Sequence, residues 1–599
     1  MKKFFLVPAL LGLTGCSIIT EVSQPGDDAP TREPTATGRG GAVSTVDLRA
    51  TLAGIEVLKS GGNAIDAAVA AAAVIGVTEP FSCGIGGGGF MLIRLPDGQV
   101  VTLDNREMTP KSFEAGLFYE GGAPIAFKEL VTSGRSVGVP GNVRGWEEAL
   151  RLYGTLDLGD VLQRAISIAE EGFDVDAYFF DQTTRNLDRF RQITSTSELF
   201  LTPEGEPLPL GTILKNPDLA KTYRLIAEGG ADAFYKGEIA QAIVDTITNP
   251  PVVMGTTPPV RPGGMQLSDL AEYKVVPRAP VESSYRGYTL YGMDAPSSGG
   301  MTVAMVLNLL SGYEPAELSR ANNLHRYIES SRLAYADRGA YMGDPAYYPV
   351  PKEGLLSMGY ADERRSLINE TQAAQAPATP GEPCAFQDAP CPPAPAPSAG
   401  IVQEAVIDKE TTHLAVVDAA GLIVSYTCTI ESEGGNGMVV PGYGFLLNNE
   451  LTDFDIPPTQ NPEAANAPKA GKRPRSSMSP TLVMKDGKPV LTLGSPGGST
   501  IITTVMQVLL NHLDFGMPID QAIAAPRISQ RNTADLTSSA ETVFLATPEA
   551  EELEALGHKF TEVPVIGSVE ALRFNDDGTV TAAAEPVRRT GGSAMVVEP

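Results

Sequence analysis

The sequence predicts an α+β protein, built from helices and antiparallel strands, and three observations support this class. An apolar, Ala-rich run over 63–77 is typical of a buried helix. Further stretches of helical spacing follow as far as residue 336. After residue 400 strand signals dominate, and two of them have the turn residues of hairpins. With 42% hydrophobic and 20% charged residues, the chain can build a large core and is not disordered as a whole.

The helices are predicted from spacing and from their stop signals. The run over 63–77 ends before Glu79-Pro80, because the residue before a proline avoids the helical conformation. A strand is then expected over 90–95. Further helices are expected at 144–153, 160–171, 218–229, 302–311 and 323–336.

Two hairpins can be aligned by counting from their turns. The first turns at Ala420-Gly421, so paired residue numbers sum to about 840–841 and Thr411 lies opposite Thr429 or its neighbour. The second turns at Asp486-Gly487, its pairs sum to 973, and Ser476 lies opposite Gly497. A helix beginning near Ser499 is expected to run over 501–513. Ser476-Ser477 and Gly497-Gly498 should therefore share one end of one hairpin.

The first residues have the pattern of a processing signal. Lys2 and Lys3 precede an apolar run that ends in Leu13-Thr14-Gly15-Cys16, which resembles a bacterial lipobox. Residues 1–16 are thus interpreted as a lipoprotein signal peptide with Cys16 lipidated, and 17–38 as a tether; the alternative is an ordinary secretory signal with a chance cysteine. Ser17 favours the outer membrane, so we expect an exported, periplasmic, lipid-anchored protein of a Gram-negative bacterium.

The other cysteines divide into two pairs by context. Cys384 and Cys391 lie in a Pro-rich segment, and export favours a local disulfide between them; the alternative is two free thiols. Cys83 and Cys428 lie in apolar surroundings and are interpreted as buried and inert. Residues 371–410 as a whole are expected to form an exposed Pro-rich loop and mobile tail.

Charge and motif order exclude several classes of protein. The 45 Lys and Arg residues against 72 Asp and Glu give a net charge of −27, which repels phosphate backbones and argues against nucleic-acid binding. The four histidines show no metal-ligand spacing, so no metal is expected. Glycines at 84–89 match a dinucleotide fingerprint but stand between a helix and a strand, which is the wrong order. A GxSxG match at 134–138 is followed by Val139-Pro140-Gly141 rather than a helix, which leaves a serine hydrolase as a weak second reading.

Ordered motifs along nearly the whole chain resemble those of the γ-glutamyltransferase (γ-glutamyl transpeptidase) family of N-terminal nucleophile hydrolases. They are Gly61 to Ala68, Gly84 to Phe90, Asn105-Arg106-Glu107, Val139-Pro140-Gly141, Pro296 to Gly300, Ala336-Asp337-Arg338, Thr411-Thr412-His413, Leu447 to Glu450, Ser476 to Thr481 and Gly494 to Gly498. The resemblance implies a four-layer αββα sandwich that cleaves itself into a large subunit, 39–410, and a small subunit, 411–599.

In this family the precursor cuts itself before a threonine, which here places the cleavage between Glu410 and Thr411. A hydroxyl needs a base to become a nucleophile, and the cut creates an α-amine of reference pKa about 7.7–8.0 on the same residue. The resemblance makes Thr411 the nucleophile, with Thr429 placed to hydrogen-bond its hydroxyl. Backbone N–H groups of Gly497 and Gly498 are expected to stabilise the oxyanion.

The same resemblance implies a site for the glutamyl headgroup. Arg106 matches the arginine that clamps the α-carboxylate, and Ser476 and Ser477 would add hydroxyl donors. Glu450 and Asp453 match the acidic pair that receives the α-ammonium. Glu431 stands where transpeptidases commonly have Asn, and 455–475 lacks the aromatic residue of a lid. We therefore expect a more open site, with hydrolysis at least comparable to transfer.

The expected function is a self-processing γ-glutamyltransferase and glutathione hydrolase that needs no cofactor. Its substrates would be glutathione and other γ-glutamyl compounds, and its acceptors water, amino acids or dipeptides. The alternative enzyme is a cephalosporin (glutaryl) acylase-like relative. A non-enzymatic surface lipoprotein that stays uncleaved is the alternative from another class.

Overall fold

The computed structural model describes residues 31–317, 319–392, 410–456 and 461–598. The lipobox with Cys16, most of the expected tether and residues 393–409 lie outside the described residues. Among the helices within these ranges, not one has both the length and the apolar character needed to span a bilayer.

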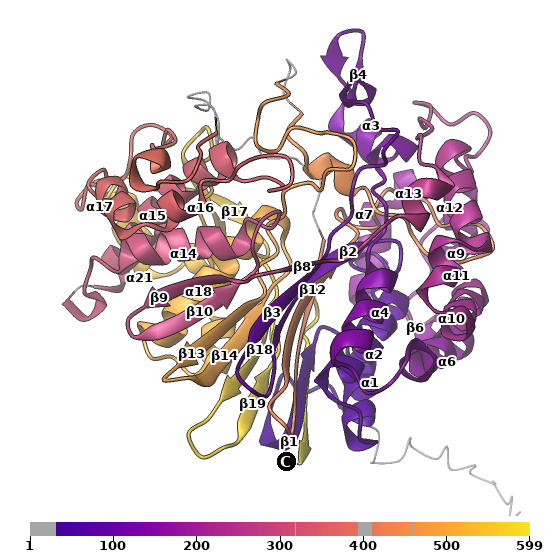
Figure 1. The fold of residues 1–599 in the computed structure, drawn as a ribbon, viewed down its shortest axis with the longest axis horizontal. Helices are drawn as coiled ribbons and strands as arrows, with labels where there is room; N and C mark the ends of the chain where they lie inside the picture. The colour runs from indigo at the N-terminus through magenta and orange to yellow at the C-terminus, as the bar shows by residue number, and fades with distance from the viewer. Residues whose placement is uncertain (1–30, 318, 393–409, 457–460, 599) are drawn as a thin grey trace, which may run out of the picture.

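Two β-sheets stack face to face in the middle of the molecule (Figure 1). The strand order along one continuous path is β8-β3-β2-β12-β11-β1-β19-β18-β14-β13-β10-β9, and β20 also pairs with β1. The strands are β1 Thr35–Thr45, β2 Gly88–Arg94, β3 Val100–Asn105, β8 Val276–Arg278, β9 Val281–Tyr285, β10 Tyr288–Gly292, β11 Thr412–Asp418, β12 Ile423–Thr429, β13 Thr481–Lys485, β14 Lys488–Gly494, β18 Glu570–Phe574, β19 Val580–Ala583 and β20 Ser593–Glu598.

Strand β1 belongs to both sheets. Its first part, 35–38, pairs with β19, and its second part, 41–45, pairs with β11 and β20. The change of partner falls at a bulge where Gly40 and Gly41 have positive φ values of 77° and 131°, which glycine adopts without strain. The expected tether over 17–38 is thus wrong at its end, because residues 35–38 are paired in a sheet.

Each sheet is covered by helices on its outer face (Figure 1). Helices α1 Leu48–Lys59, α2 Ala64–Thr78 and α4 Asn142–Tyr153 cover the sheet that contains β2, β11 and β12. Helices α14 Gly299–Leu310, α15 Arg320–Tyr341 and α18 Ile501–Leu513 cover the sheet that contains β9, β10, β13 and β14. The result is the four-layer αββα sandwich.

Alternation along the strands builds the layers, because successive side chains point to opposite faces. In β11, Leu414 and Val416 pack toward α1 and α2, whereas Ala415 and Val417 pack between the sheets. In β13, Val483 faces the helices of the second sheet and Leu482 faces the inter-sheet layer.

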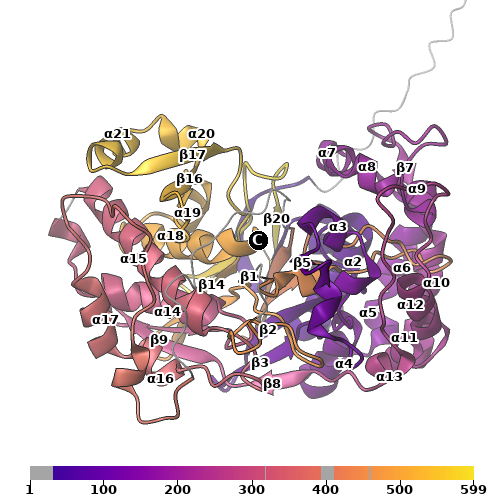
Figure 2. The ribbon, with the colours of Figure 1, turned by 90° about the horizontal axis from the view of Figure 1, so that it is seen from above.

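Shorter elements decorate the two flanks, and Figure 2 shows β16 and β17 beside α20 and α21 at one end. They are α3 Phe127–Val131, α5 Leu158–Val161, α6 Gln163–Glu171, α7 Ala177–Arg185, α8 Leu187–Phe190, α9 Thr194–Phe200, α10 Pro217–Gly229, α11 Ala231–Tyr235, α12 Glu238–Thr248, α13 Leu267–Ala271, α16 Lys352–Leu356, α17 Met358–Arg365, α19 Ile519–Ala524, α20 Thr542–Leu545, α21 Pro548–Ala555, β4 Tyr119–Glu120, β5 Ala123–Pro124, β6 Phe173–Asp174, β7 Ile213–Leu214, β15 Ile528–Ser529, β16 Thr537–Glu541 and β17 Lys559–Val563.

The predicted helices and the first hairpin are confirmed, and the second hairpin needs a correction. The helix expected over 160–171 is divided into α5 and α6. In the first hairpin Thr412 pairs with Cys428, which gives the predicted sum. In the second, Lys485 pairs with Lys488 as predicted, but a bulge between Val483 and Met484 shifts the pairing by one residue. Ser476 forms a bridge with Ser297 instead.

Two disulfides lie among the described residues. One joins Cys384 to Cys391, the pair for which a local bridge was expected. The other joins Cys83 to Cys428. Both are buried, as expected, but they are bonded to each other, a pairing that the sequence did not predict. The first part of the expected mobile segment is also ordered, because Ala373 donates to the Leu556 carbonyl and Gly381 donates to Asp337.

Candidate active site

The first hairpin brings Thr411 and Thr429 to the same end of one sheet. Because Thr412 pairs with Cys428, the two threonines lie opposite each other one residue further along. The disulfide from Cys428 ties this strand end to Cys83, just before the glycine run. Both threonines are buried.

Two hydroxyl groups converge on the carbonyl group that precedes Thr411. The Thr411 hydroxyl donates to the Glu410 carbonyl oxygen at 2.7 Å, and the Thr429 hydroxyl donates to the same oxygen at 2.9 Å. The two hydroxyl oxygens are 3.2 Å apart. The backbone N–H of Glu431 donates to the Thr429 oxygen at 2.9 Å, which directs the Thr429 proton toward the carbonyl. The nucleophile predicted from the sequence thus lies against the bond that it would cleave.

Arg589 and Tyr178 hold the residues on both sides of this bond. The Arg589 guanidinium forms an ion pair with the Glu410 carboxylate and donates to the Thr411 carbonyl at 3.0 Å. The Tyr178 hydroxyl donates to the other Glu410 carboxylate oxygen at 3.2 Å. Burial raises the pKa of Glu410 to about 7, although Arg589 acts in the opposite direction. Sequence reasoning missed Arg589, which lies 178 residues from Thr411 and belongs to no recognisable motif.

The glycine run over 84–89 lets the backbone pack under the threonine pair. A side chain on Gly87 would have its Cβ 2.0 Å from the Thr429 carbonyl oxygen, and one on Gly86 would be equally close to the Leu446 carbonyl oxygen. These distances are impossible for a real Cβ, so close approach explains the glycines without a nucleotide ligand.

Arg106 is buried and paired with both acids that the sequence analysis assigned to the headgroup site. Its guanidinium lies 2.5 Å from a Glu450 oxygen and 2.6 Å from an Asp453 oxygen. Burial alone would lower the Arg106 pKa, but the two carboxylates raise it overall, so Arg106 stays charged. Burial raises the pKa of Glu450 well above its ordinary value, although Arg106 opposes this shift.

Glu431 connects the threonine pair to the charged residues. Its backbone N–H donates to Thr429, and its carboxylate accepts a hydrogen bond from the Asn449 amide, next to Glu450 in the chain. Glu431 has a φ of +79°, a conformation that costs about 1–3 kcal/mol for a residue with this side chain. Asn tolerates positive φ better than Glu does, which is a physical reason why transpeptidases commonly have Asn at this position.

The two serines lie beside the Arg106 site but are held differently. Arg106 donates to the carbonyls of Pro474 and Arg475, which brings the chain to Ser476. The Ser477 hydroxyl accepts a hydrogen bond of 2.7 Å from Arg338, so its own proton can point elsewhere. Arg338 belongs to the Ala336-Asp337-Arg338 motif, a signal to which the sequence analysis gave no role.

Gly497 and Gly498 form the turn between β14 and α18. Their φ values of +127° and +54° lie in the region that favours glycine. Gly494, at the end of β14, packs against the His413 ring, because a Cβ on Gly494 would lie 2.4 Å from it. The turn that follows is thereby anchored beside the strand that begins at Thr412, although no hydrogen bond links it to Thr411 in the described residues.

Residues 455–475, which contain no aromatic side chain, are bonded to the chain near Asp453. Asn466 donates to the Asp453 carbonyl at 2.7 Å, and Arg475 pairs with Asp455. The Lys472 ammonium donates to the carbonyls of Ala465 and Ala467, and burial lowers its pKa to about 8. The described part of this segment is therefore held in place by hydrogen bonds and an ion pair.

The structure has the four-layer αββα sandwich of an N-terminal nucleophile hydrolase, and the Thr411 hydroxyl lies 2.7 Å from the Glu410 carbonyl oxygen. Residues 50–596 match the Gamma-glutamyltranspeptidase family. The chain belongs to this family.

Two of the similar proteins come from bacteria. A "Glutathione hydrolase proenzyme" of Bacillus subtilis (strain 168) is 39% identical over 564 residues, covering 92% of this chain and 91% of the relative. An "Acylase ACY 1 proenzyme" of Pseudomonas sp. (strain SE83) is 35% identical over 577 residues, covering 93% and 95%.

Solved structures agree with this placement. A cephalosporin acylase from Bacillus halodurans superimposes with a TM-score of 0.82 at 28% identity, covering 96% of this chain and 99% of that one. A Helicobacter pylori gamma-glutamyltranspeptidase chain gives a TM-score of 0.51 at 32% identity, covering 60% and 96%.

Proposed function

We propose that the protein is a self-processing γ-glutamyltransferase and glutathione hydrolase with Thr411 as its nucleophile. The observation that carries the proposal is the placement of the Thr411 and Thr429 hydroxyls on the Glu410 carbonyl oxygen, at 2.7 and 2.9 Å. The names of the relatives, glutathione hydrolase proenzyme among them, support the same activity.

Maturation begins with attack of the Thr411 hydroxyl oxygen on the Glu410 carbonyl carbon. The Thr429 hydroxyl donates to the oxygen that becomes negative, which stabilises the tetrahedral intermediate. The C–N bond breaks, the nitrogen takes the hydroxyl proton, and Glu410 is left as an ester on Thr411. Water hydrolyses the ester, which yields the Glu410 carboxylate and a free Thr411 amine.

The mature enzyme repeats this chemistry on its substrate. The Thr411 amine removes the proton from its own hydroxyl, which attacks the γ-carbonyl carbon of the donor. The amide bond breaks, the leaving amine takes the proton, and a γ-glutamyl ester forms on Thr411. Water or an amine acceptor then attacks the ester and restores the hydroxyl. Gly497 and Gly498 supply backbone N–H groups for the oxyanion.

The charged pocket recognises the amino-acid headgroup of the donor. A planar guanidinium is suited to bind a carboxylate by two hydrogen bonds. Arg106 donates to the carbonyls of Pro474 and Arg475, the two residues that precede Ser476. Glu450, Asp453 and Glu431 receive the α-ammonium. Binding exchanges ion pairs within the protein for ion pairs with the substrate, so neither Arg106 nor the acids are left uncompensated.

A glutaryl acylase is the second candidate, favoured by the acylase names among relatives and by the TM-score of 0.82 to a cephalosporin acylase. A glutaryl group has no ammonium, so it would offer the Glu450 and Asp453 carboxylates no positive charge in exchange for Arg106. The pairing of Arg106 with both acids therefore favours the γ-glutamyl donor.

The test combines chain mapping with two matched amides. Edman sequencing of the smaller polypeptide should begin at Thr411, and a γ-glutamyl anilide should be turned over much faster than the glutaryl anilide that lacks the amino group. A single uncleaved chain, or a different first residue, would overturn the proposal. Preference for the glutaryl compound would instead make the protein an acylase.

Hydrolysis is expected to be at least comparable to transfer. The test incubates the enzyme with a γ-glutamyl anilide and a low concentration of glycylglycine, and compares the amounts of the two products, free glutamate and γ-glutamyl-glycylglycine. A large excess of the conjugate would contradict the expectation based on Glu431 and on the absence of an aromatic residue in 455–475.

We also propose that the protein is exported and lipid-anchored at Cys16. Two disulfides support export, because such bonds persist in oxidising compartments. Mass spectrometry of the protein from membrane fractions should find an acylated N-terminus at Cys16, and replacement of Cys16 by Ser should release the protein into the soluble fraction. Unchanged membrane association of that variant would exclude the anchor.

A further inference from the structure

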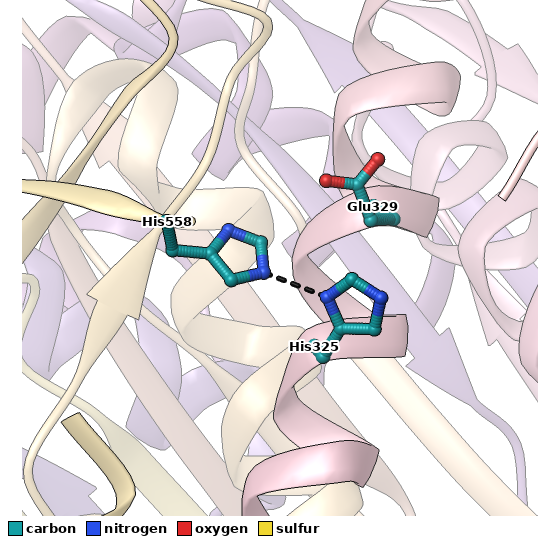
Figure 3. Close-up of side chains that lie close together, drawn as sticks. All are labelled: His325, Glu329 and His558. Atoms are coloured by element: carbon teal, nitrogen blue, oxygen red, sulfur yellow. Dashed lines mark hydrogen bonds between the residues drawn. The ribbon is translucent and has the colours of Figure 1, made fainter. Parts of the chain in front are cut away.

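Two of the four histidines meet far from the active site, together with a glutamate (Figure 3). His325 and Glu329 lie one helical turn apart on α15, and His558 lies between α21 and β17. All three are buried, with exposed fractions of 1%, 3% and 8%. No metal-ligand spacing is visible along the chain, because His325 and His558 are separated by 233 residues.

The two rings share one hydrogen bond. The partners of the two His325 ring nitrogens determine which of them carries the proton. His325 Nδ1 lies 2.7 Å from His558 Nε2, and His325 Nε2 lies 2.7 Å from the Asn369 carbonyl oxygen. A carbonyl oxygen only accepts, so Nε2 of His325 carries the proton and Nδ1 presents its lone pair. A ring N–H bonded to a backbone carbonyl is the usual support of a metal-binding histidine.

Glu329 is oriented by contacts on its far side. Arg332 donates to one carboxylate oxygen at 2.7 Å, and the backbone N–H of Ala374 donates to the other at 3.2 Å. The oxygen that accepts from Ala374 keeps a second lone pair, whereas the other oxygen also accepts from Arg332 Nε at 3.1 Å. One ligand atom each from His325, Glu329 and His558 lies within 4.8 Å of the others.

We propose that His325, Glu329 and His558 bind a divalent transition-metal ion, with Zn²⁺ the ion of choice. Two imidazole nitrogens and one carboxylate oxygen are typical zinc ligands, and water completes the tetrahedron. Ligands about 2.0–2.1 Å from zinc lie about 3.3 Å from one another, so the two rings must separate by about half an ångström. The proton of His558 Nε2 moves to Nδ1 of the same ring when the metal binds.

The ion would join the two halves of the mature protein, a consequence that rests on the proposed cleavage before Thr411. His325 and Glu329 belong to the large subunit, and His558 belongs to the small one. The site lies where α15, residues 369–376 and the end of α21 converge. Its role would thus be structural, holding the subunits together after the peptide bond is cut.

The test titrates metal-free protein with Zn²⁺ by calorimetry and with Co²⁺ by its visible absorbance. We expect one equivalent of Zn²⁺ and the absorption bands of tetrahedral Co²⁺. His558→Gln keeps an amide donor for His325 but removes a ligand, and it should weaken Zn²⁺ binding by at least about tenfold. Glu329→Gln should act in the same direction. His512→Gln, which replaces a histidine bonded only to the Met517 carbonyl among the described contacts, should leave binding unchanged.

Failure of the metal proposal can be told apart from failure of the proposed function. The same titrations on Thr411→Ala protein, which stays uncleaved, should give the same stoichiometry because the site needs folding and not cleavage. Folded wild-type protein that binds no equivalent at 100-fold excess of Zn²⁺, or that binds as tightly after His558→Gln, overturns the metal site and leaves the enzyme proposal untouched.

Discussion

The two ends of the active site are held together by different forces. At Thr411, two neutral hydroxyl groups converge on one carbonyl oxygen within 3 Å. At Arg106, charged side chains that are mostly buried neutralise one another. The first end depends on position, since a hydroxyl displaced by 1 Å no longer reaches its target. The second depends on charge balance, and its contacts can be exchanged for those of a substrate.

The largest expected effect is at Thr411, where activity depends on the position of the hydroxyl group. Thr411→Ala removes the attacking oxygen, so self-cleavage should cease and glutamate release should fall to background. Thr411→Ser keeps the oxygen but loses the γ-methyl group that restricts rotation, so it should cleave itself more slowly than wild type. Denaturing gels and an anilide assay measure both effects. Cleavage at 410/411 in the alanine variant would rule out Thr411 as the nucleophile.

The next largest effect is at the charged end. Arg106→Lys keeps the charge but loses the planar fork, and kcat/KM for a γ-glutamyl anilide should fall about 100-fold, since hydrogen bonds to charged groups contribute about 1.5–3 kcal/mol. Self-cleavage should continue, because Arg106 does not contact Glu410 or Thr411 in the described contacts. Arg191→Lys, at an exposed pair with Glu206, is the matched control. A fall in kcat/KM equal to that of the control would count against the carboxylate clamp.

A third prediction concerns His413, which lies two residues from Thr411 and is buried in its uncharged form. Burial lowers the pKa of His413 to about 3, whereas in the unfolded chain it is about 6.5. Between these values the unfolded state binds the extra proton, so the free energy of unfolding falls as the pH falls below 6.5. At pH 5 the loss should be about 2 kcal/mol.

Urea unfolding of the uncleaved Thr411→Ala precursor at pH 7 and pH 5 measures this loss, and adding His413→Gln to that precursor should reduce it. The contribution is fully present above pH 6.5 and is lost progressively toward pH 3. Equal pH dependence of the precursor with and without His413→Gln would show that His413 is not the group responsible.

The smallest of the four effects is on maturation. Arg589→Lys can still pair with Glu410 but cannot also hold the Thr411 carbonyl in the same way, so self-cleavage should slow about tenfold, as expected for about 1.4 kcal/mol of lost hydrogen bonding. The rate is followed on gels from freshly refolded precursor. Cleavage at the wild-type rate would mean that Arg589 has no part in positioning the bond.

The sequence predicted what depends on local patterns. The helix over 64–78 and the pairing of Thr411 with Thr429 follow from periodicity and turn chemistry, which are visible within a few residues. The Cys83–Cys428 bridge, Arg589 and the pair of His325 with His558 could not be found in this way, because each joins segments more than 170 residues apart. The bulge in the second hairpin was missed because a one-residue insertion leaves no signal in the apolar pattern.

Strands from before and after residue 410 alternate in both sheets: β2 and β3 extend the β11–β12 hairpin, while β9 and β10 extend the β13–β14 hairpin. Cutting one peptide bond therefore produces two polypeptides that were never separate folding units. Neither is expected to regain its shape alone after denaturation, because each supplies the hydrogen-bonding edge on which the other was assembled. The mature enzyme would then be a product of its folding history, reachable through the intact chain and not by mixing its halves.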